Sequence, residues 1–297
     1  MVLGKGIHRS PISKLNTTAL TDIARKNTKR VILFTNARNE KNMKEWAAHH
    51  LLIGFDLIYI FDHKSDIPLH REFINFDRRV IVERCNWENP VKLPLMKRAA
   101  KISESMHADW FLYLDADEFL MLNAFYGVKQ MLNVYSYADS LAINWLLFGT
   151  NNHIKEPTGL IMENYTRSDE KLNKHVKSFV RPSQVVNVTN PHFFHIKNPY
   201  RNITITNKIM PVRPFNECDI GFNYAHAYIA HYINQSEETY IKRKVLMPTD
   251  DSNSLRPRDL NIHANHNTVK NPMPKMKYAP GVKTFLQHFI DIYKSQI

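Results

Sequence analysis

The stretch Trp110-Phe-Leu-Tyr-Leu-Asp-Ala-Asp-Glu118 is an apolar run that ends in two aspartates separated by one residue. The apolar run predicts a buried strand, with Asp115 and Asp117 at its carboxyl end. Two carboxylates held close together repel each other unless a cation lies between them. Hard cations take oxygen ligands, and a diphosphate completes their coordination. The D-x-D motif therefore predicts a site for a divalent metal and a nucleoside diphosphate, and its alternative is a solvated acidic turn.

Three further apolar runs precede this strand, at residues 30–36, 56–62 and 80–82. Between the runs, apolar residues recur at helical spacing over 43–51 and 95–106. Strands that alternate with helices predict an α/β fold with a mainly parallel central sheet flanked by helices. Ligands of such sheets collect at the carboxyl ends of the strands. Polar clusters stand at three of these ends, so we expect them to form one site: Asn36 to Glu40, Asp62 to Ser65 and Asp115 to Glu118.

The second half of the chain has a mixed pattern. We expect a helix over 237–246, begun by Ser236, then a loop-rich tract over 247–280 and a closing helix over 282–293. We divide the chain into an N-terminal arm (1–29), one catalytic domain (30–250) and a C-terminal loop and helix that pack on it (251–297). We expect this half to be mixed and partly antiparallel. Its four expected strands are 140–148, 159–163, 176–180 and 225–233.

The composition and net charge of the chain limit the kinds of molecule that it is expected to bind. The chain has 297 residues, 43% of them hydrophobic, and a formal net charge of +12. A basic surface attracts anions such as nucleotides or an acidic membrane face. No Lys/Arg block is long enough for a nucleic-acid-binding arm, and no RNA-binding aromatic signature occurs, so we expect no nucleic-acid partner. The polar start of the chain and the lack of a span-length apolar run predict a soluble, cytoplasmic protein. A luminal enzyme that has lost its anchor is the alternative.

Six motifs, in this order along the chain, resemble those of glycosyltransferases with the GT-A fold, in particular glycosyltransferase family 92 and the wider family-2-like group. Each motif alone is modest, and the series covers roughly residues 30–250. The matching stretches are Ala37-Arg-Asn-Glu40, Tyr59-Ile-Phe-Asp-His-Lys-Ser65, Trp110 to Leu120, Ile143-Asn-Trp-Leu-Leu-Phe-Gly149, Val176-Lys-Ser-Phe-Val-Arg-Pro182 and His231-Tyr-Ile-Asn-Gln-Ser236.

This resemblance implies a GT-A type nucleotide-sugar-binding fold and a hexosyltransferase activity. The donor would be a nucleotide-sugar, by family expectation a UDP-sugar, and the acceptor a glycan, a protein or a lipid. The cofactor would be Mn²⁺ or Mg²⁺, and a histidine ligand would favour Mn²⁺ because imidazole is the softer ligand. The resemblance also suggests inversion at the anomeric carbon.

The resemblance assigns roles to individual residues as well. Arg38, Asn39 and Glu40 would line the nucleotide pocket, and Asp62 would meet the base or the ribose. Asp115 would contact the ribose or the metal.

Asp117 would ligate the metal that stabilises the leaving group, and His231 would be a third protein ligand, with His192 or His195 as alternatives. Relatives often carry Lys-Ser where this chain has Gln235-Ser236, so Lys242, Arg243 or Lys244 would take over phosphate binding.

Inversion needs a carboxylate base beside the acceptor hydroxyl. Four candidates lie between the Asn-Trp motif and the C-terminal motifs. We select Glu163, because it ends an apolar run that can hold it in place; a surface glutamate is the alternative reading. The other candidates are Glu156, Asp169 and Glu170.

Three other classes of protein remain as alternatives. A haloacid-dehalogenase-like phosphatase also uses a strand that ends in D-x-D, but it expects the motif on the first strand. A nucleotidyltransferase needs a Gly-rich loop, whereas the loop after the first strand, Asn36 to Glu40, has no glycine. A non-catalytic nucleotide- or metal-binding module would use the carboxylates for a structural ion.

Overall fold

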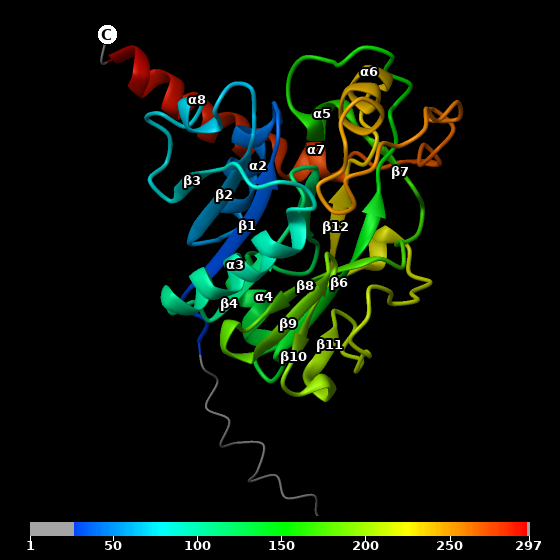
Figure 1. Cartoon of the computed structure of the whole chain (residues 1–297). Coiled ribbons are helices and arrows are strands. Elements are labelled where there is room, and N and C mark those ends of the chain that lie inside the picture. The colour runs from blue at the N-terminus through cyan, green and yellow to red at the C-terminus, as the bar shows by residue number, and fades with distance from the viewer. Residues whose placement is uncertain (1–26, 296–297) are drawn as a thin grey trace, which may run out of the picture.

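The computed structural model describes residues 27–295 of the chain. In its first part, strands and helices alternate as the sequence predicts, and each predicted run overlaps the element found (Figure 1). The apolar runs are short, and those of β1 and β4, in the middle of the sheet, are fully buried, which suits strands covered on both faces. The run of β3, at the edge of the sheet, is only half-buried. These elements are β1 (Val31–Ala37), α2 (Met43–Leu52), β2 (Leu57–His63), β3 (Val80–Cys85), α3 (Lys92–Ser105) and β4 (Trp110–Tyr113).

The second part is mixed, as expected. It adds the strands β5 (Glu118–Leu122), β6 (Ser140–Leu147), β7 (Arg167–Ser168), β8 (Val176–Val180), β9 (Val185–Asn190), β10 (Phe193–Ile196), β11 (Asn202–Thr204), β12 (Ala227–His231) and β13 (Val269–Lys270). Its helices are α4 (Val128–Val134), α5 (Ile161–Asn164), α6 (Glu237–Tyr240), α7 (Met273–Lys277) and α8 (Ala279–Ser295), with a π-helical turn η5 (Ile241–Val245) directly after α6.

Within the described residues, the central sheet has nine strands in the order β3-β2-β1-β4-β8-β6-β12-β5, and β11 pairs with β6. β1, β2, β3 and β4 are mutually parallel. β8 is antiparallel to both β4 and β6, and β12 is parallel to β6. β6 and β12 therefore run in the same direction as β4, so the carboxyl ends of six strands meet at one edge of the sheet.

Alternate residues of β1 point to two different cores. Val31 and Leu33 belong to the core that includes Trp46 of α2, whereas Ile32 and Phe34 belong to the core that includes Leu95 of α3. The two helices thus cover opposite faces of the sheet, and α8 packs along α2 (Figure 1). β1 and β4 are therefore packed on both faces, and the residues that follow them are positioned by a rigid sheet.

One predicted strand is wrong. Residues 159–163 do not form a strand, because α5 begins at Ile161. The carboxylate of Glu45, on α2, accepts hydrogen bonds from the backbone N–H groups of Ile161 (2.7 Å) and Met162 (3.1 Å). These are orphan donors of a helix N-terminus, and a capping carboxylate satisfies them. The cap comes from a residue more than 100 positions away, which no local pattern reveals.

The helix predicted to begin after Ser236 is found, with one difference in geometry. Ser236 caps α6 as predicted, since its Oγ accepts from the N–H of Thr239. The predicted helix then continues as η5, with π rather than α geometry. The N-terminal arm predicted for 1–29 lies, except for its last three residues, outside the described part of the chain. The division into domains stays a prediction. Across residues 27–295, every helix is too short or too polar to traverse a lipid bilayer.

Candidate active site

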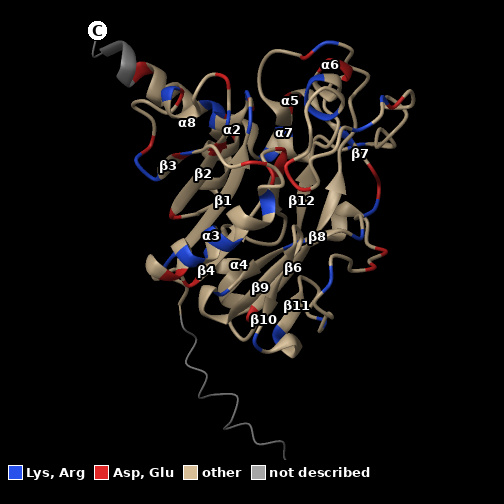
Figure 2. Ribbon diagram, in the orientation of Figure 1, with Lys and Arg blue, Asp and Glu red and all other residues tan. Residues whose placement is uncertain are grey.

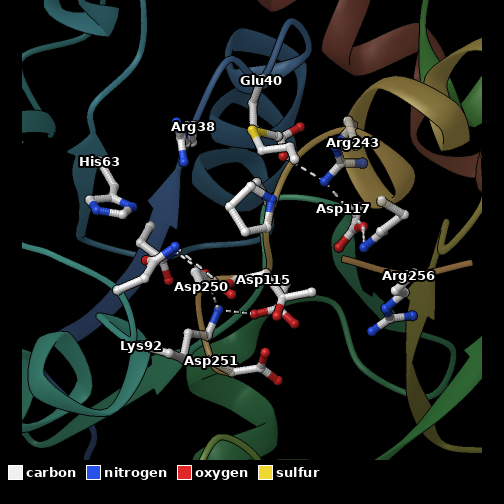
Figure 3. A pocket seen from close by; sticks show the side chains of 17 residues that line it. Arg38, Glu40, His63, Lys92, Asp115, Asp117, Arg243, Asp250, Asp251 and Arg256 are labelled. Atoms are coloured by element: carbon white, nitrogen blue, oxygen red, sulfur yellow. Dashed lines mark hydrogen bonds and ion pairs between the residues drawn. The ribbon is translucent and has the colours of Figure 1, made fainter. Parts of the chain in front are cut away.

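A cavity of about 140 Å³ opens at the carboxyl edge of the sheet (Figure 3). Its walls come from the ends of β1, β2 and β4, from η5, and from the tract that follows η5. The sequence predicts that the three strand ends form one site, and they do meet here. Acidic and basic residues come together in this region (Figure 2). The charged residues that line the cavity are Arg38, Glu40, Lys92, Asp115, Asp117, Arg243, Lys244, Asp250, Asp251 and Arg256.

Asp115 is held by two buried lysines. Lys92 donates to its Oδ1, and Lys177 donates to its Oδ2 at 3.2 Å. The side chains of Lys92 and Lys177 are only 4% and 1% exposed. Burial acts to raise the pKa of Asp115, but the two ammonium groups outweigh it and hold the pKa well below its usual range. Asp115 is therefore an anion whose two oxygens already have cationic partners.

Asp117 is almost completely buried and faces three nitrogen groups. Its Oδ2 lies 3.3 Å from Nη2 of Arg243 and 3.6 Å from Nζ of Lys244, and its Oδ1 lies 3.5 Å from Nε2 of His231. Burial raises the pKa of Asp117, and Lys244, Arg243 and His231 together lower it far more. The carboxylate is thus ionised in a desolvated setting, where electrostatic interactions are strong.

The register of β5 and β12 brings His231 to Asp117. These strands are antiparallel, and His231 pairs with Glu118. Just beyond the pair, the N–H of Tyr232 donates to the carbonyl of Asp117 at 3.0 Å. Nδ1 of His231 is buried without a hydrogen-bond partner among the described residues. The predicted proximity of His231 to the D-x-D motif is found, and β5, which the sequence does not predict, produces it.

Asp117 and His231 present an oxygen and a nitrogen to the same space, a donor set that suits Mn²⁺. Asp115 fits less well, because Lys92 and Lys177 already engage both of its oxygens. Among residues 27–295, no three His, Cys, Asp or Glu residues come close enough together to hold an ion. Of the three predicted metal ligands, Asp117 and His231 are therefore placed where they could bind one cation, and Asp115 is not.

Arg243 links the two sides of the cavity. Its Nη2 donates to Oε1 of Glu40 at 2.5 Å and to Asp117 at 3.3 Å (Figure 3). The side chain of Glu40 is 14% exposed, and burial raises its pKa although Arg243 opposes the shift. The predicted phosphate-binding cluster after α6 therefore reaches the cavity through Arg243 and Lys244. Lys242 points elsewhere and pairs with Glu238 at 2.7 Å.

Three other predicted residues stand apart from this cavity. Asp62 is fully buried and accepts from Arg84 and from the N–H of Leu69, so it holds the loop after β2 and does not line the cavity. Asn39 lines a second cavity next to the first, as Lys242 does. Glu163, on α5, pairs with Lys283 at 2.7 Å and lines neither cavity.

The sequence does not indicate Lys92 or Lys177 as site residues, and it places Glu118 in the cluster Asp115 to Glu118 without assigning it a role. Glu118 is fully buried, and its Oε2 accepts from the N–H of Asp115 at 2.8 Å. Burial, then the charge of Asp115, raises the pKa of Glu118 to about 7. The sequence does contain one signal: Lys177 lies in a short strand with three apolar residues, and buried lysines almost always have a charged partner.

Asp250 also reaches the site, from the tract after η5. Its carbonyl accepts from the N–H groups of Val91 (2.9 Å) and Lys92 (3.0 Å). Its carboxylate accepts from the amide of Asn36 and lies 3.6 Å from Nζ of Lys92. This tract therefore crosses the mouth of the cavity and fills part of it. The cavity that this tract leaves, about 140 Å³, is smaller than the roughly 300 Å³ at which ligand pockets usually begin.

Comparisons with known proteins point to one family. The model of glycosyltransferase family 92 matches residues 32–273. A glycosyltransferase family 92 protein of Oryza sativa subsp. japonica is 27% identical over 198 residues, which are 61% of this chain and 32% of that protein. The chain thus spans about a third of the length of this curated relative. The crystal structure of HddC from Yersinia pseudotuberculosis aligns with a TM-score of 0.33 at 11% identity, over 68% of this chain and 77% of that one, which is too remote to support an argument.

Proposed function

The chain belongs to glycosyltransferase family 92, and from this premise we propose that it transfers a sugar from a nucleotide-sugar to an acceptor, with the donor bound in the cavity around Asp117. One observation carries the proposal: an ionised D-x-D pair, with Asp117 buried and Asp115 partly exposed, lies at the carboxyl edge of a mainly parallel sheet, surrounded by basic side chains. Nucleotides bind at such edges in α/β proteins. The mixed nine-stranded sheet supports a GT-A type fold as part of the proposal.

The basic side chains suit a diphosphate leaving group. When the bond between the sugar and the diphosphate breaks, negative charge develops on the departing phosphate oxygen. Arg243 and Lys244 line the cavity and lie within 3.6 Å of Asp117 before reaction, so they stabilise this charge with little reorganisation. Arg256 adds a third cation to the lining, from the tract after η5. Arg38 lies at the end of β1, on the side where the nucleoside would sit. A UDP-linked hexose is the donor that the family resemblance suggests.

Asp117 and His231 are the residues that would hold a divalent cation. When bound there, Mn²⁺ or Mg²⁺ would act as a Lewis acid toward the diphosphate. In its absence, Arg243 and Lys244 neutralise Asp117. A metal–nucleotide complex would have to compete with them, and the nucleotide phosphates offer these two cations new partners. We therefore expect nucleotide and metal to bind together.

Inversion and the acceptor class belong to the proposal as well. A single displacement by an acceptor hydroxyl inverts the anomeric carbon and needs a nearby carboxylate base. Glu163 would need a large movement of α5 to serve, because it is paired with Lys283 on α8. The acceptor remains a glycan, a protein or a lipid. The phosphatase alternative is not favoured, since the D-x-D motif follows the fourth strand, β4, and the family match points to sugar transfer.

A thermal-shift experiment tests the donor site. We expect UDP with Mn²⁺ to raise the melting temperature of the protein more than the sum of the shifts with UDP alone and with Mn²⁺ alone, because a ligand stabilises the folded state in proportion to RT ln(1 + [L]/Kd). The Asp117→Ala variant should lose the extra shift. Equal shifts in the wild type and in Asp117→Ala would contradict the assignment of Asp117.

A further inference from the structure

A second cavity, of about 300 Å³, adjoins the first. The two cavities share three lining residues, Glu40, Arg243 and Met247, so a group at their boundary reaches both. The second cavity lies between the loop that follows β1 and the segment made of α6 and η5. Nothing in the donor proposal uses it.

Hydrogen bonds hold each wall of the second cavity in place before any ligand binds. The N–H of Asn39 donates to Oγ of Ser65 at 3.0 Å, and Oδ1 of Asn39 accepts from the N–H of Asp66 at 2.8 Å. On the opposite side, the N–H of Glu156 donates to Glu238 of α6 at 2.9 Å. The cavity is therefore preformed, which lowers the entropic cost of binding.

Most of the charges that line the second cavity have a partner of opposite charge, whereas Asp66 accepts from the amide of Asn39 at 3.1 Å. Lys41 lies 2.5 Å from Glu156, Lys242 lies 2.7 Å from Glu238, and Arg243 lies 2.5 Å from Glu40. The lining has three cations (Lys41, Lys242, Arg243) and three acids (Glu40, Asp66, Glu156), so it is formally neutral. An anionic ligand would have to break one of these pairs.

The uncharged polar groups of the lining suit sugar hydroxyls. Asn42 and Gln235 each carry an amide, which both donates and accepts hydrogen bonds. The amide of Asn39 is already engaged with Asp66, and the hydroxyl of Thr239 accepts from Ser236 and keeps its own proton to donate. A hydroxyl group also donates and accepts, so a ring with several hydroxyls can satisfy such a surface. The chemistry of the cavity therefore matches an uncharged saccharide better than a phosphate or a carboxylate.

Resting on the proposed function, we propose that the second cavity is the acceptor subsite, that it takes the terminal residue of an uncharged glycan, and that Glu40 is the base at its inner end. In the transfer step, the acceptor oxygen forms a bond to the anomeric carbon of the donor sugar. The bond from that carbon to the diphosphate oxygen breaks, and its electron pair leaves with the nucleoside diphosphate. The hydroxyl proton passes to the carboxylate of Glu40.

The position of Glu40 fits this role in two ways. Its carboxylate lines both cavities, as a base between donor and acceptor must. Arg243 holds that carboxylate and also contacts Asp117, so the proton acceptor and the donor site are linked through one side chain. Burial raises the pKa of Glu40, which makes the carboxylate more basic than one in water.

A cavity-filling variant separates the acceptor subsite from the donor site. Asn42 lines only the second cavity, and we expect Asn42→Trp to block it. The donor is the UDP-hexose that the wild type hydrolyses fastest, and the acceptors are neutral 4-nitrophenyl glycosides. Hydrolysis of the donor by water should stay within about twofold of the wild type, while kcat/KM for transfer should fall at least 20-fold. Asn223→Trp, an exposed residue that lines neither cavity, is the matched control and should change neither rate.

Charge provides a second test. Glu156→Gln leaves Lys41 without its partner and gives the second cavity a formal charge of +1. Transfer to 4-nitrophenyl β-D-glucuronide, relative to the matching neutral glucoside, should rise about fivefold or more. Glu40→Gln should lower transfer by about 10²-fold or more while UDP still binds, because general-base catalysis contributes 10²–10⁴-fold.

The outcomes distinguish the two proposals. If the wild type neither binds UDP nor hydrolyses any UDP-hexose, the donor proposal fails. If it hydrolyses a donor but no neutral glycoside accepts the sugar, or if Asn42→Trp transfers as well as the control, the acceptor subsite is overturned and the donor site stands. Near-normal transfer by Glu40→Gln would overturn the role of Glu40.

Discussion

At the scale of single residues, Lys177 shows how strongly charge is concentrated around the D-x-D motif. Its side chain is 1% exposed, and its Nζ lies 3.2 Å from Asp115 and 3.6 Å from Glu118. Removing one member of a buried ion pair leaves the other charge uncompensated, which costs about 3–5 kcal/mol. Lys177→Met should therefore lower the free energy of unfolding in urea by about 3 kcal/mol.

The control for this prediction lies three residues away. Lys174 is half exposed, and its Nζ is 3.9 Å from Glu217, so Lys174→Met should change the free energy of unfolding by less than about 0.5 kcal/mol. Similar losses in the two variants would show that the buried charge of Lys177 is not what holds Asp115 in place.

The sequence predicts those site residues that lie next to an apolar strand. It does not predict those that only the folded chain brings to the site. Asp115 and Asp117 come just after the apolar strand β4, and His231 is the last residue of the apolar strand β12, so a local pattern reveals them. Lys92 and Lys177 reach Asp115 from elements 23 residues before it and 62 residues after it, and only the fold brings them together. Asp62 fits the predicted pattern equally well, but its oxygens serve the loop after β2.

At the scale of secondary-structure elements, the contact between α2 and α5 gives a pH-dependent prediction. Glu45 of α2 caps α5, and burial raises its pKa to about 7 from an ordinary value of 4.5. Between pH 4.5 and 7, the carboxyl group of Glu45 therefore stays protonated in the native state, whereas it ionises in the unfolded state. The stability from this group is complete below pH 4.5 and is lost as the pH rises to about 7.

Glu45→Gln removes this titration. The free energy of unfolding of the wild type, relative to that of the variant, should fall by about 2–3 kcal/mol between pH 4.5 and 7.5, since each unit of pKa shift corresponds to about 1.4 kcal/mol. Urea denaturation at four pH values measures the difference. A difference that is independent of pH would show that Glu45 ionises in the native state as it does in water.

At the scale of the whole molecule, hydrophobic periodicity predicted the first half of the fold because each strand there is adjacent in sequence to a helix that covers it. The second half depends on pairings between distant segments. β8 inserts antiparallel between β4 and β6, and β5 pairs with β12 across more than 100 residues. Such pairings are fixed by register and burial, which leave no local signal, and they bring His231 to Asp117.

The central claim is that the cavity at the carboxyl edge binds a nucleotide-sugar and activates it through Asp117. The most direct measurement is the turnover of a panel of UDP-hexoses with Mn²⁺ by the wild type and by Asp117→Asn, each checked for native folding by circular dichroism. We predict measurable hydrolysis or transfer by the wild type and a loss of at least about 10²–10³-fold in a folded Asp117→Asn protein, the scale of a lost electrostatic stabiliser. Turnover by folded Asp117→Asn at the wild-type rate would contradict the account.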